Sequence, residues 1–134
     1  MKRTIPCTVL LVLMLACPLA GIAQSPDIPT AIATALGQGD ASGLSAYFND
    51  NVELVVGSKN DIFSKQQSHG ILSEFFRKNR VNRFNVLHKG ERDLSCFIIG
   101  TLETDYATYR VYVLTRKNEN QNLIQQLRIE PSNE

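Results

Sequence analysis

The segment SKQQSHGILSEFFRKNR, residues 64–80, decides the fold of this chain. Its apolar residues recur at helical spacing and form one wide apolar stripe. The stripe consists of Ile71, Leu72, Phe75 and Phe76. Ser64 followed by Gln67 fits a capping box at the start of a helix, and the basic residues at the end suit the negative end of a helix dipole. We therefore expect an amphipathic helix over this segment.

Beyond this helix, from Val81 onward, apolar and polar residues alternate with the period of a β-strand. Short polar gaps divide this part of the chain into four segments, at about 82–89, 94–103, 106–116 and 122–130. Each gap is short enough for a hairpin, so neighbouring segments are expected to pair antiparallel. The pattern predicts a four-stranded antiparallel meander.

The register of the two central strands follows from the gap between them. A two-residue turn at residues 104–105 would place Ile98 opposite Val111. One face of the sheet is then almost wholly apolar and should pack against the helices. In the other strands and at the strand ends that face takes Phe84, Val86, His88, Leu94, Leu127 and Ile129.

The opposite face of the meander is rich in apolar residues for a surface that meets water. It carries Leu87, Phe97, Ile99, Tyr112, Leu114 and Ile124 among the polar residues Asn85, Thr101, Arg110, Gln126 and Arg128. Exposed apolar patches mark contact surfaces, and aromatic residues mixed with arginine are typical of interfaces. We expect this face to form a homodimer interface through Phe97, Ile99, Arg110, Tyr112 and Leu114. Cover by the N-terminal leader or by the first strand is the alternative.

Two short helices are expected before the long one. The first covers residues 29–36, with a proline well placed at its start, and a glycine-rich corner ends it. Asp40 can cap a second helix that extends to Phe48. A strand over residues 52–57 follows, and a polar loop over residues 58–61 leads toward the long helix.

Residues 1–23 have the three-part layout of a secretory signal peptide. Lys2 and Arg3 precede an apolar run over residues 8–20, and small residues precede a cut before Gln24. The run is shorter than the ~18 residues that a membrane-spanning helix needs, so no transmembrane segment is expected. The protein is therefore predicted to be exported from the bacterial cytoplasm, either to the periplasm or as a secreted protein.

Cys17 offers an alternative end to the signal, because residues 14–17 loosely resemble a bacterial lipobox whose cysteine is acylated. The first two positions of that stretch do not match such a box, and Pro18 directly after the cysteine is unusual. These departures argue against a lipid anchor. Cleavage before Gln24 leaves Cys96 as the single cysteine of the mature chain, which permits no internal disulfide.

The part of the chain after the signal, residues 24–134, has the length of one domain with one core. The whole chain has 14 basic and 13 acidic residues, so removal of Lys2 and Arg3 leaves 12 against 13, a net charge of −1. Nucleic acids and anionic membrane surfaces attract strongly basic proteins. Neither is expected as a partner of this domain.

The order of the predicted elements resembles the nuclear transport factor 2-like fold, a cystatin-like cone. The resemblance is carried by the helical corner over residues 28–48, the strand over 51–57, the capped helix over 64–80 and the meander over 81–130. It implies an α+β fold in which a curved antiparallel sheet wraps around a long helix, with two short N-terminal helices and room for a pocket at the wide end. With its export signal and its Phe-Phe-Arg helix end at residues 75–77, the chain also resembles an uncharacterised family of exported proteins from Gram-negative bacteria.

The resemblance implies architecture but no particular chemistry, because this fold hosts isomerases, dehydratases, ligand-binding proteins and inert adaptors. The ketosteroid isomerase and dehydratase branches place an acid, histidine or tyrosine set in the pocket, and no such set matches this chain residue by residue. The side chains expected to face the cone interior and bind a ligand are Tyr47, Glu53, His88 and Tyr109. Each also has an ordinary structural interpretation, as a core aromatic residue or a polar residue on a strand.

Metal and cofactor chemistry has little support in the sequence. The two histidines are His69 and His88, and no HxH, HxxxH or CxxC spacing occurs. His88 and Cys96 would share one sheet face in adjacent strands as a nucleophilic pair, but nothing marks an oxyanion hole or an orienting carboxylate. Neither a metal nor a cofactor is predicted.

The sequence as a whole favours an exported, non-enzymatic binding or interaction domain for a small apolar ligand or a protein partner. The alternative is a small pocket enzyme of the isomerase or dehydratase type that uses His88 or Tyr109, with Glu53 as a base. An enclosed cavity of ~300 Å³ or more with two convergent titratable groups would favour the enzyme.

Overall fold

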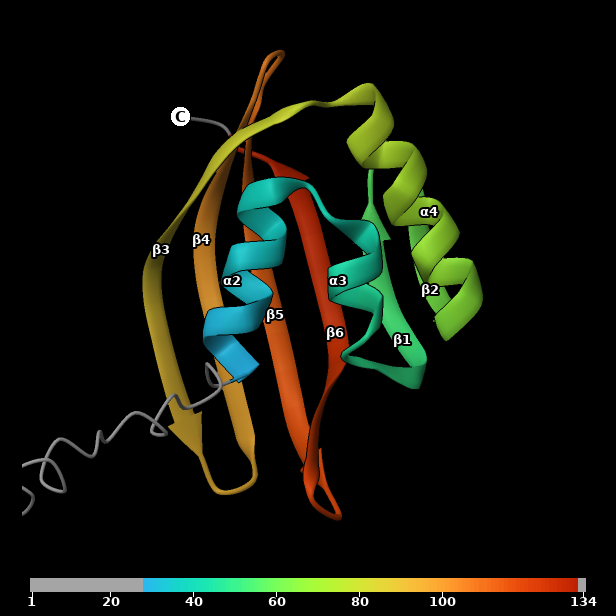
Figure 1. The fold of residues 1–134 in the computed structure, drawn as a ribbon, viewed down its shortest axis with the longest axis vertical. Coiled ribbons are helices and arrows are strands. Elements are labelled where there is room, and N and C mark those ends of the chain that lie inside the picture. The colour runs from blue at the N-terminus through green and yellow to red at the C-terminus, as the bar shows by residue number, and fades with distance from the viewer. Residues whose placement is uncertain (1–27, 133–134) are drawn as a thin grey trace, which may run out of the picture.

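The computed structural model describes residues 28–132 of the chain and places three helices and six strands within them (Figure 1). The helices are α2 (Ile28–Gln38), α3 (Ala41–Ser45) and α4 (Lys65–Lys78). The strands are β1 (Phe48–Val56), β2 (Lys59–Ser64), β3 (Val81–Arg92), β4 (Ser95–Thr104), β5 (Thr108–Asn118) and β6 (Gln121–Pro131). The predicted signal peptide and the candidate lipid anchor Cys17 lie outside the described residues.

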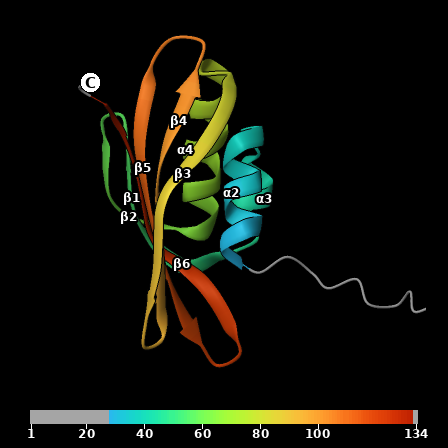
Figure 2. The same ribbon diagram turned by 90° about the vertical axis from the view of Figure 1, so that its left-hand side faces the viewer.

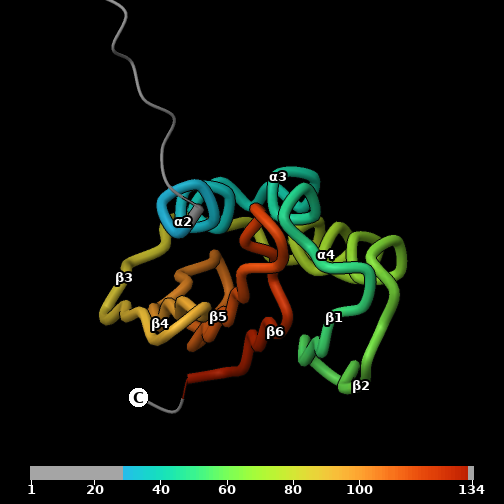
Figure 3. The backbone as a smooth tube through the Cα atoms, turned by 90° about the horizontal axis from the view of Figure 1, so that it is seen from below, coloured from blue at the N-terminus to red at the C-terminus, as the bar shows by residue number. Residues whose placement is uncertain are grey.

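The six strands form one curved sheet, and all three helices lie on its concave side (Figures 2 and 3). The strand order is β2-β1-β6-β5-β4-β3, and β3 to β6 form the predicted antiparallel meander. β1 pairs antiparallel with β2 and parallel with β6, and the sequence did not predict the parallel pair. The α+β fold class with a curved sheet around a long helix is confirmed, and this one parallel pair makes the sheet mixed.

The long helix α4 begins with the expected capping box. The backbone N–H of Gln67 donates to the Ser64 hydroxyl at 3.1 Å, and the backbone N–H of Ser64 donates to the Gln67 side-chain oxygen at 3.0 Å. Two N–H groups that lack partners at a free helix start are satisfied in this way. The helix lies over β1 and β2 and beside α3, while α2 lies over β3 and β4. The end of the sheet formed by β1 and β2 is therefore the part that faces α4.

The core fills the space between the helices and the concave face. Leu72 of α4 and Val111 of β5 are fully buried, and Ile98 of β4 is 2% exposed. The predicted apolar face of the central strands, with Ile98 and Val111 turned toward the helices, is thus confirmed. Phe84 is partly buried and packs against the same core.

The second helix is shorter than expected, because the chain enters the sheet early. α3 ends at Ser45, and Phe48 begins β1 instead of ending a helix. The backbone carbonyl of Tyr47 accepts a hydrogen bond of 2.6 Å from the backbone N–H of Ile124 in β6. The helical spacing of the local sequence favours a longer helix, but pairing with the distant strand β6 ends the helix before Tyr47.

The turn between β4 and β5 is longer than the predicted two residues. The backbone N–H of Thr104 donates to the carbonyl of Ala107 at 3.0 Å, and the Thr104 hydroxyl donates to the same carbonyl at 2.8 Å. As a result Ile98 pairs with Val113, two residues away from the predicted partner Val111. Side chains alternate with a period of two, so a shift of two residues leaves every side chain on its predicted face.

A bulge in β3 places His88 on the convex face, so its expected position inside the cone is wrong. Val86 pairs with Gly100, but His88 pairs with Ile99, which leaves Leu87 as an extra residue. One extra residue moves all the side chains that follow it to the other face. Leu94, also expected on the concave face, lies in the β3–β4 turn and is 53% exposed.

A second bulge, in β6, has the opposite effect on Ile124. Gln126 pairs with Leu114 and Ile124 pairs with Thr115, which leaves Gln125 as the extra residue. Ile124 was expected on the convex face, and this prediction is wrong because the bulge turns it into the core, where it is fully buried.

Candidate functional site

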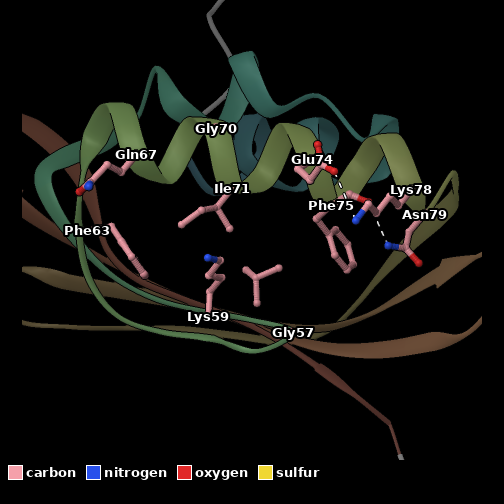
Figure 4. A pocket seen from close by; sticks show the side chains of 11 residues that line it. Gly57, Lys59, Phe63, Gln67, Gly70, Ile71, Glu74, Phe75, Lys78 and Asn79 are labelled. Atoms are coloured by element: carbon pink, nitrogen blue, oxygen red, sulfur yellow. Dashed lines mark hydrogen bonds and ion pairs between the residues drawn. The ribbon is translucent and has the colours of Figure 1, made fainter.

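A pocket of about 530 Å³ lies between α4 and the β1–β2 hairpin (Figure 4). Its apolar lining includes Val56, Phe63, Ile71 and Phe75. Its polar lining consists of Lys59, Gln67, Glu74, Lys78 and Asn79. A concave and mostly apolar site with a few polar groups is the usual composition of a small-molecule site.

The residues that α4 contributes to the pocket lie along one side of this helix because of their spacing. Gln67, Ile71, Glu74 and Lys78 follow one another at intervals of three or four residues, so they lie along one side of the helix. Leu72, one position farther around the helix, points into the core. The amphipathic pattern that buries α4 therefore also places a row of mainly polar residues at the edge of the pocket.

The tight β1–β2 turn places a lysine on the floor of the pocket. Gly57, at φ 61°, and Ser58 form the turn, which pairs Val56 with Lys59. The positive φ suits glycine, which has no Cβ to clash with the backbone. Paired residues share a face, and Val56 is buried on the concave face, so Lys59 lies on that face as well.

Lys59 points into the pocket from β2. Figure 4 shows its side chain rising toward Ile71 of α4, with its ammonium group beside Phe63. Among the described residues, no hydrogen bond or ion pair to the ammonium is found. The pocket thus contains a positive charge with no protein partner.

The acid of the pocket is engaged by two neighbouring cations. Glu74 Oε2 accepts a hydrogen bond from Arg77 Nη2 at 2.6 Å and lies 3.3 Å from Lys78 Nζ. These contacts, that of Arg77 first, lower the pKa of Glu74. A carboxylate whose pKa is lowered is a weak base at neutral pH, so Glu74 is suited to ion pairing rather than to proton transfer.

Tyr109 contacts two residues that line one end of the pocket, Phe75 and Asn79. Its hydroxyl donates to the Asn79 side-chain oxygen at 3.3 Å, and the Asn79 amide nitrogen donates to the Phe75 carbonyl at 3.0 Å. The rings of Phe75 and Tyr109 meet edge to face, with centroids 5.2 Å apart. Tyr109 therefore adjoins the pocket through two lining residues and is not itself part of the lining.

The other three residues predicted to bind a ligand lie elsewhere. Glu53 is exposed on the convex face and accepts a hydrogen bond of 3.1 Å from Gln126. His88 lies on the same face, with its ring centroid 5.5 Å from that of Phe97. Tyr47 is partly buried and packs against the core. The four predicted residues do not converge on one site, because β1 and β3 present Glu53 and His88 to the convex face.

The pair of His88 and Cys96, considered as a nucleophilic pair, is also separated by the sheet. Cys96 pairs with Thr115 of β5 and lies on the concave face, whereas His88 pairs with Ile99 on the convex face. Among residues 28–132, no group of three or more histidine, cysteine, aspartate or glutamate residues is arranged to hold a metal ion. None of the helices that the structure describes is long and apolar enough to cross a membrane.

The five residues predicted to form an interface lie together on the convex face of β4 and β5. Phe97 pairs with Leu114, Ile99 with Tyr112, and Arg110 with a neighbouring threonine. The four apolar and aromatic side chains are half-buried and Arg110 is exposed. All the described helices lie on the other side of the sheet, so they leave this face open (Figure 3).

A second hollow, of about 680 Å³, lies between α2 and the β3–β4 part of the sheet. Its lining includes Pro29, at the start of the described residues, and Phe84 and Ile98 of the sheet. The open pocket under α4 combines an apolar lining with a lysine on its floor and an ion pair at its edge, and we take it as the candidate site.

Comparison with known proteins places this architecture in a family. A family model described as a domain of unknown function, DUF4783, matches residues 29–130. The crystal structure of a DUF4783 family protein from Bacteroides ovatus is 42% identical, with a TM-score of 0.76, and the match covers 82% of this chain and 100% of that one. A DUF4783 family protein from Bacteroides uniformis is 34% identical, with a TM-score of 0.77 and coverage of 81% and 100%.

A more distant structure shows the same fold. A protein from Catenulispora acidiphila, described as having a ketosteroid isomerase-like fold and solved with trimethylamine, is 15% identical, with a TM-score of 0.61 and coverage of 82% and 88%. No curated protein matches the chain significantly. The chain belongs to the DUF4783 family and has the nuclear transport factor 2-like fold.

Proposed function

We propose that this protein is an exported binding domain that holds a small, largely apolar molecule between α4 and the β1–β2 hairpin. The observation that carries the proposal is the pocket of about 530 Å³ with an apolar lining and a few polar groups. Export is supported by the signal-like sequence of residues 1–23.

The geometry supports binding better than catalysis. An isomerase or dehydratase needs an acid and a base that converge on the substrate. Glu53 and His88 lie on the convex face, on the far side of the sheet from the pocket. Glu74 forms ion pairs with Arg77 and Lys78, and the Tyr109 hydroxyl donates a hydrogen bond to Asn79.

A fluorescent probe tests the proposed site. N-Phenyl-1-naphthylamine is neutral and apolar, and its emission rises when it leaves water. Gly70 lines the pocket, and a Cβ added there would meet no heavy atom within 4 Å, so the helix tolerates a side chain at this position and a leucine there would take up space for a ligand. We expect Gly70→Leu to weaken probe binding about tenfold or more, measured by fluorescence titration.

The matched control is Ser73→Leu, which adds the same side chain to an exposed position of α4 outside the pocket. The control should bind the probe like the unaltered protein. Absence of probe binding to the unaltered protein, or equal loss in both variants, would contradict the proposed site.

We also propose that the convex face of β4 and β5 forms a homodimer. The patch of Phe97, Ile99, Tyr112 and Leu114 supports this, because aromatic and aliphatic side chains gathered on an open sheet face are typical of interface cores. Arg110 beside the patch adds a residue type that interfaces favour. A second copy of the chain is the partner that the proposal requires.

Replacing Tyr112 with glutamate is expected to convert the dimer to a monomer, because a carboxylate at the centre of the patch loses its water on association. Sedimentation velocity over a range of protein concentrations measures the change. Tyr106→Glu, in the β4–β5 turn and 78% exposed, is the matched control and should leave the dimer intact. A monomeric unaltered protein at every concentration, or the same mass for both variants, would refute the dimer.

A further inference from the structure

Most hydrogen-bond acceptors among the side chains of the candidate site already have a protein donor. The Gln67 side-chain oxygen accepts the backbone N–H of Ser64 in the capping box. The Asn79 side-chain oxygen accepts the hydroxyl of Tyr109. Glu74 Oε2 is engaged by Arg77 and Lys78. Gln67, Asn79 and Glu74 thus each already accept at least one protein hydrogen bond, and Glu74 Oε1 is the acceptor atom of these side chains without a donor among the described residues.

The donors of the same residues are not all in use. The Lys59 ammonium and the amide nitrogen of Gln67 have no partner among the residues that the structure describes. The orientation of the Gln67 amide is fixed, because its oxygen must face the backbone N–H of Ser64. The groups left to contact a ligand are therefore mainly N–H donors.

The charges of the pocket lead to the same conclusion. Lys78 and Glu74 form an ion pair and cancel, so Lys59 leaves the lining with one uncompensated positive charge. Lys59 is exposed to water on one side, and Figure 4 shows its ammonium beneath Ile71 and beside Phe63. A charge next to apolar walls gains most from an opposite charge that also accepts its hydrogen bonds.

We infer that the ligand of this pocket is an amphipathic monoanion, with a carboxylate on Lys59 and an apolar body between α4 and the hairpin. This inference rests on the proposed function and names the class of ligand. A carboxylate carries one negative charge and only acceptor atoms, which matches the one free ammonium of the lining. The apolar side chains of Val56, Phe63, Ile71 and Phe75 would cover the hydrocarbon part.

Competition between ligands of equal chain length tests the inference. Decanoate, decanol and decyltrimethylammonium share a ten-carbon chain and differ in the charge of the head group. The ability of each compound to displace bound N-phenyl-1-naphthylamine is measured by fluorescence, and decanoate is also titrated directly by calorimetry. Lys59→Met keeps much of the apolar stem and removes the charge, so it should weaken decanoate binding about tenfold or more, while decanol binding stays nearly unchanged.

Two further variants make the result specific. Lys59→Arg keeps the charge and should retain most of the decanoate affinity. Lys65→Met removes an exposed lysine of the first turn of α4 that does not line the pocket, and it should have little effect. Decanoate binding that survives Lys59→Met, an equal loss for decanol, or an equal loss in Lys65→Met would overturn the inference.

The proposed function can fail separately from this inference. If the neutral probe does not bind but calorimetry shows Lys59-dependent decanoate binding, the site binds anions and the general apolar site is wrong. If the probe binds and the head group makes no difference, the apolar site stands and the role of Lys59 is wrong.

Discussion

The Gly100→Ala variant is expected to lose about 3 kcal/mol of unfolding free energy. A Cβ at this position of β4 would lie 2.4 Å from the backbone oxygen of Asn85 and 2.4 Å from Cζ of Phe84. The Phe84 ring can move at the cost of core packing, but the Asn85 carbonyl is held in the paired strand β3. Urea unfolding followed by circular dichroism measures the loss.

Gly70→Ala is the matched control for this prediction. Gly70 lies inside α4, and an added Cβ would meet no heavy atom within 4 Å. Alanine has the higher helix propensity, so the same substitution should here raise the unfolding free energy by roughly 0.5–1 kcal/mol. Equal effects of the two substitutions would contradict the packing of Phe84 against Gly100.

Leu72→Ala is expected to destabilise the fold by about 3 kcal/mol, since it leaves a cavity where α4 packs on the sheet. The Leu72 side chain is fully buried and belongs to the core between the helices and the concave face. The unfolding free energy from chemical denaturation is again the measurement. The result bears on the pocket, because Leu72 holds in place the helix that forms one of its walls.

Ser73→Ala is the control for Leu72→Ala. Ser73 is the next residue of the same helix and is exposed, so its replacement should change the unfolding free energy by no more than about 0.5 kcal/mol. A loss below about 1 kcal/mol for Leu72→Ala would show that α4 does not pack on the sheet as described.

The elements with strong local patterns were predictable from the sequence. The capping box at Ser64 and the apolar stripe of α4 lie within one segment, so no distant contact is needed to recognise them. The meander from β3 to β6 was predictable for the same reason, because short turns join neighbouring strands. Ile98 and Val111 lie on their predicted face although the predicted register is wrong by two residues. Side chains alternate with a period of two, so an even shift does not change the face.

The errors arose where distant pairing overrides the local pattern. The bulges at Leu87 and Gln125 each add one residue, which reverses the face of His88 and of Ile124. Neither bulge has a glycine or another local mark in the sequence. The start of β1 at Phe48 depends on parallel pairing with β6, a strand far along the chain.

The pocket residues were missed for a more local reason. The polar composition of residues 58–61 predicts a loop, although a glycine followed by serine between alternating segments is a known signal for a two-residue hairpin turn. That turn would have placed Lys59 opposite Val56 on the concave face. In the sequence, Gln67 and Lys78 fit the capping and the charge pattern of helix ends, and only the hairpin beneath α4 makes their shared side of the helix part of a pocket.

The most direct test of the proposed site is to map ligand contacts by NMR on the protein labelled with nitrogen-15. Added decanoate should shift the backbone amides of residues 56–59 and 67–79, which frame the pocket between the hairpin and α4. Amides of α2 and of the convex face of β4 and β5 should stay in place. Shifts confined to the α2–β3 hollow or to the convex face would contradict a binding site beneath α4.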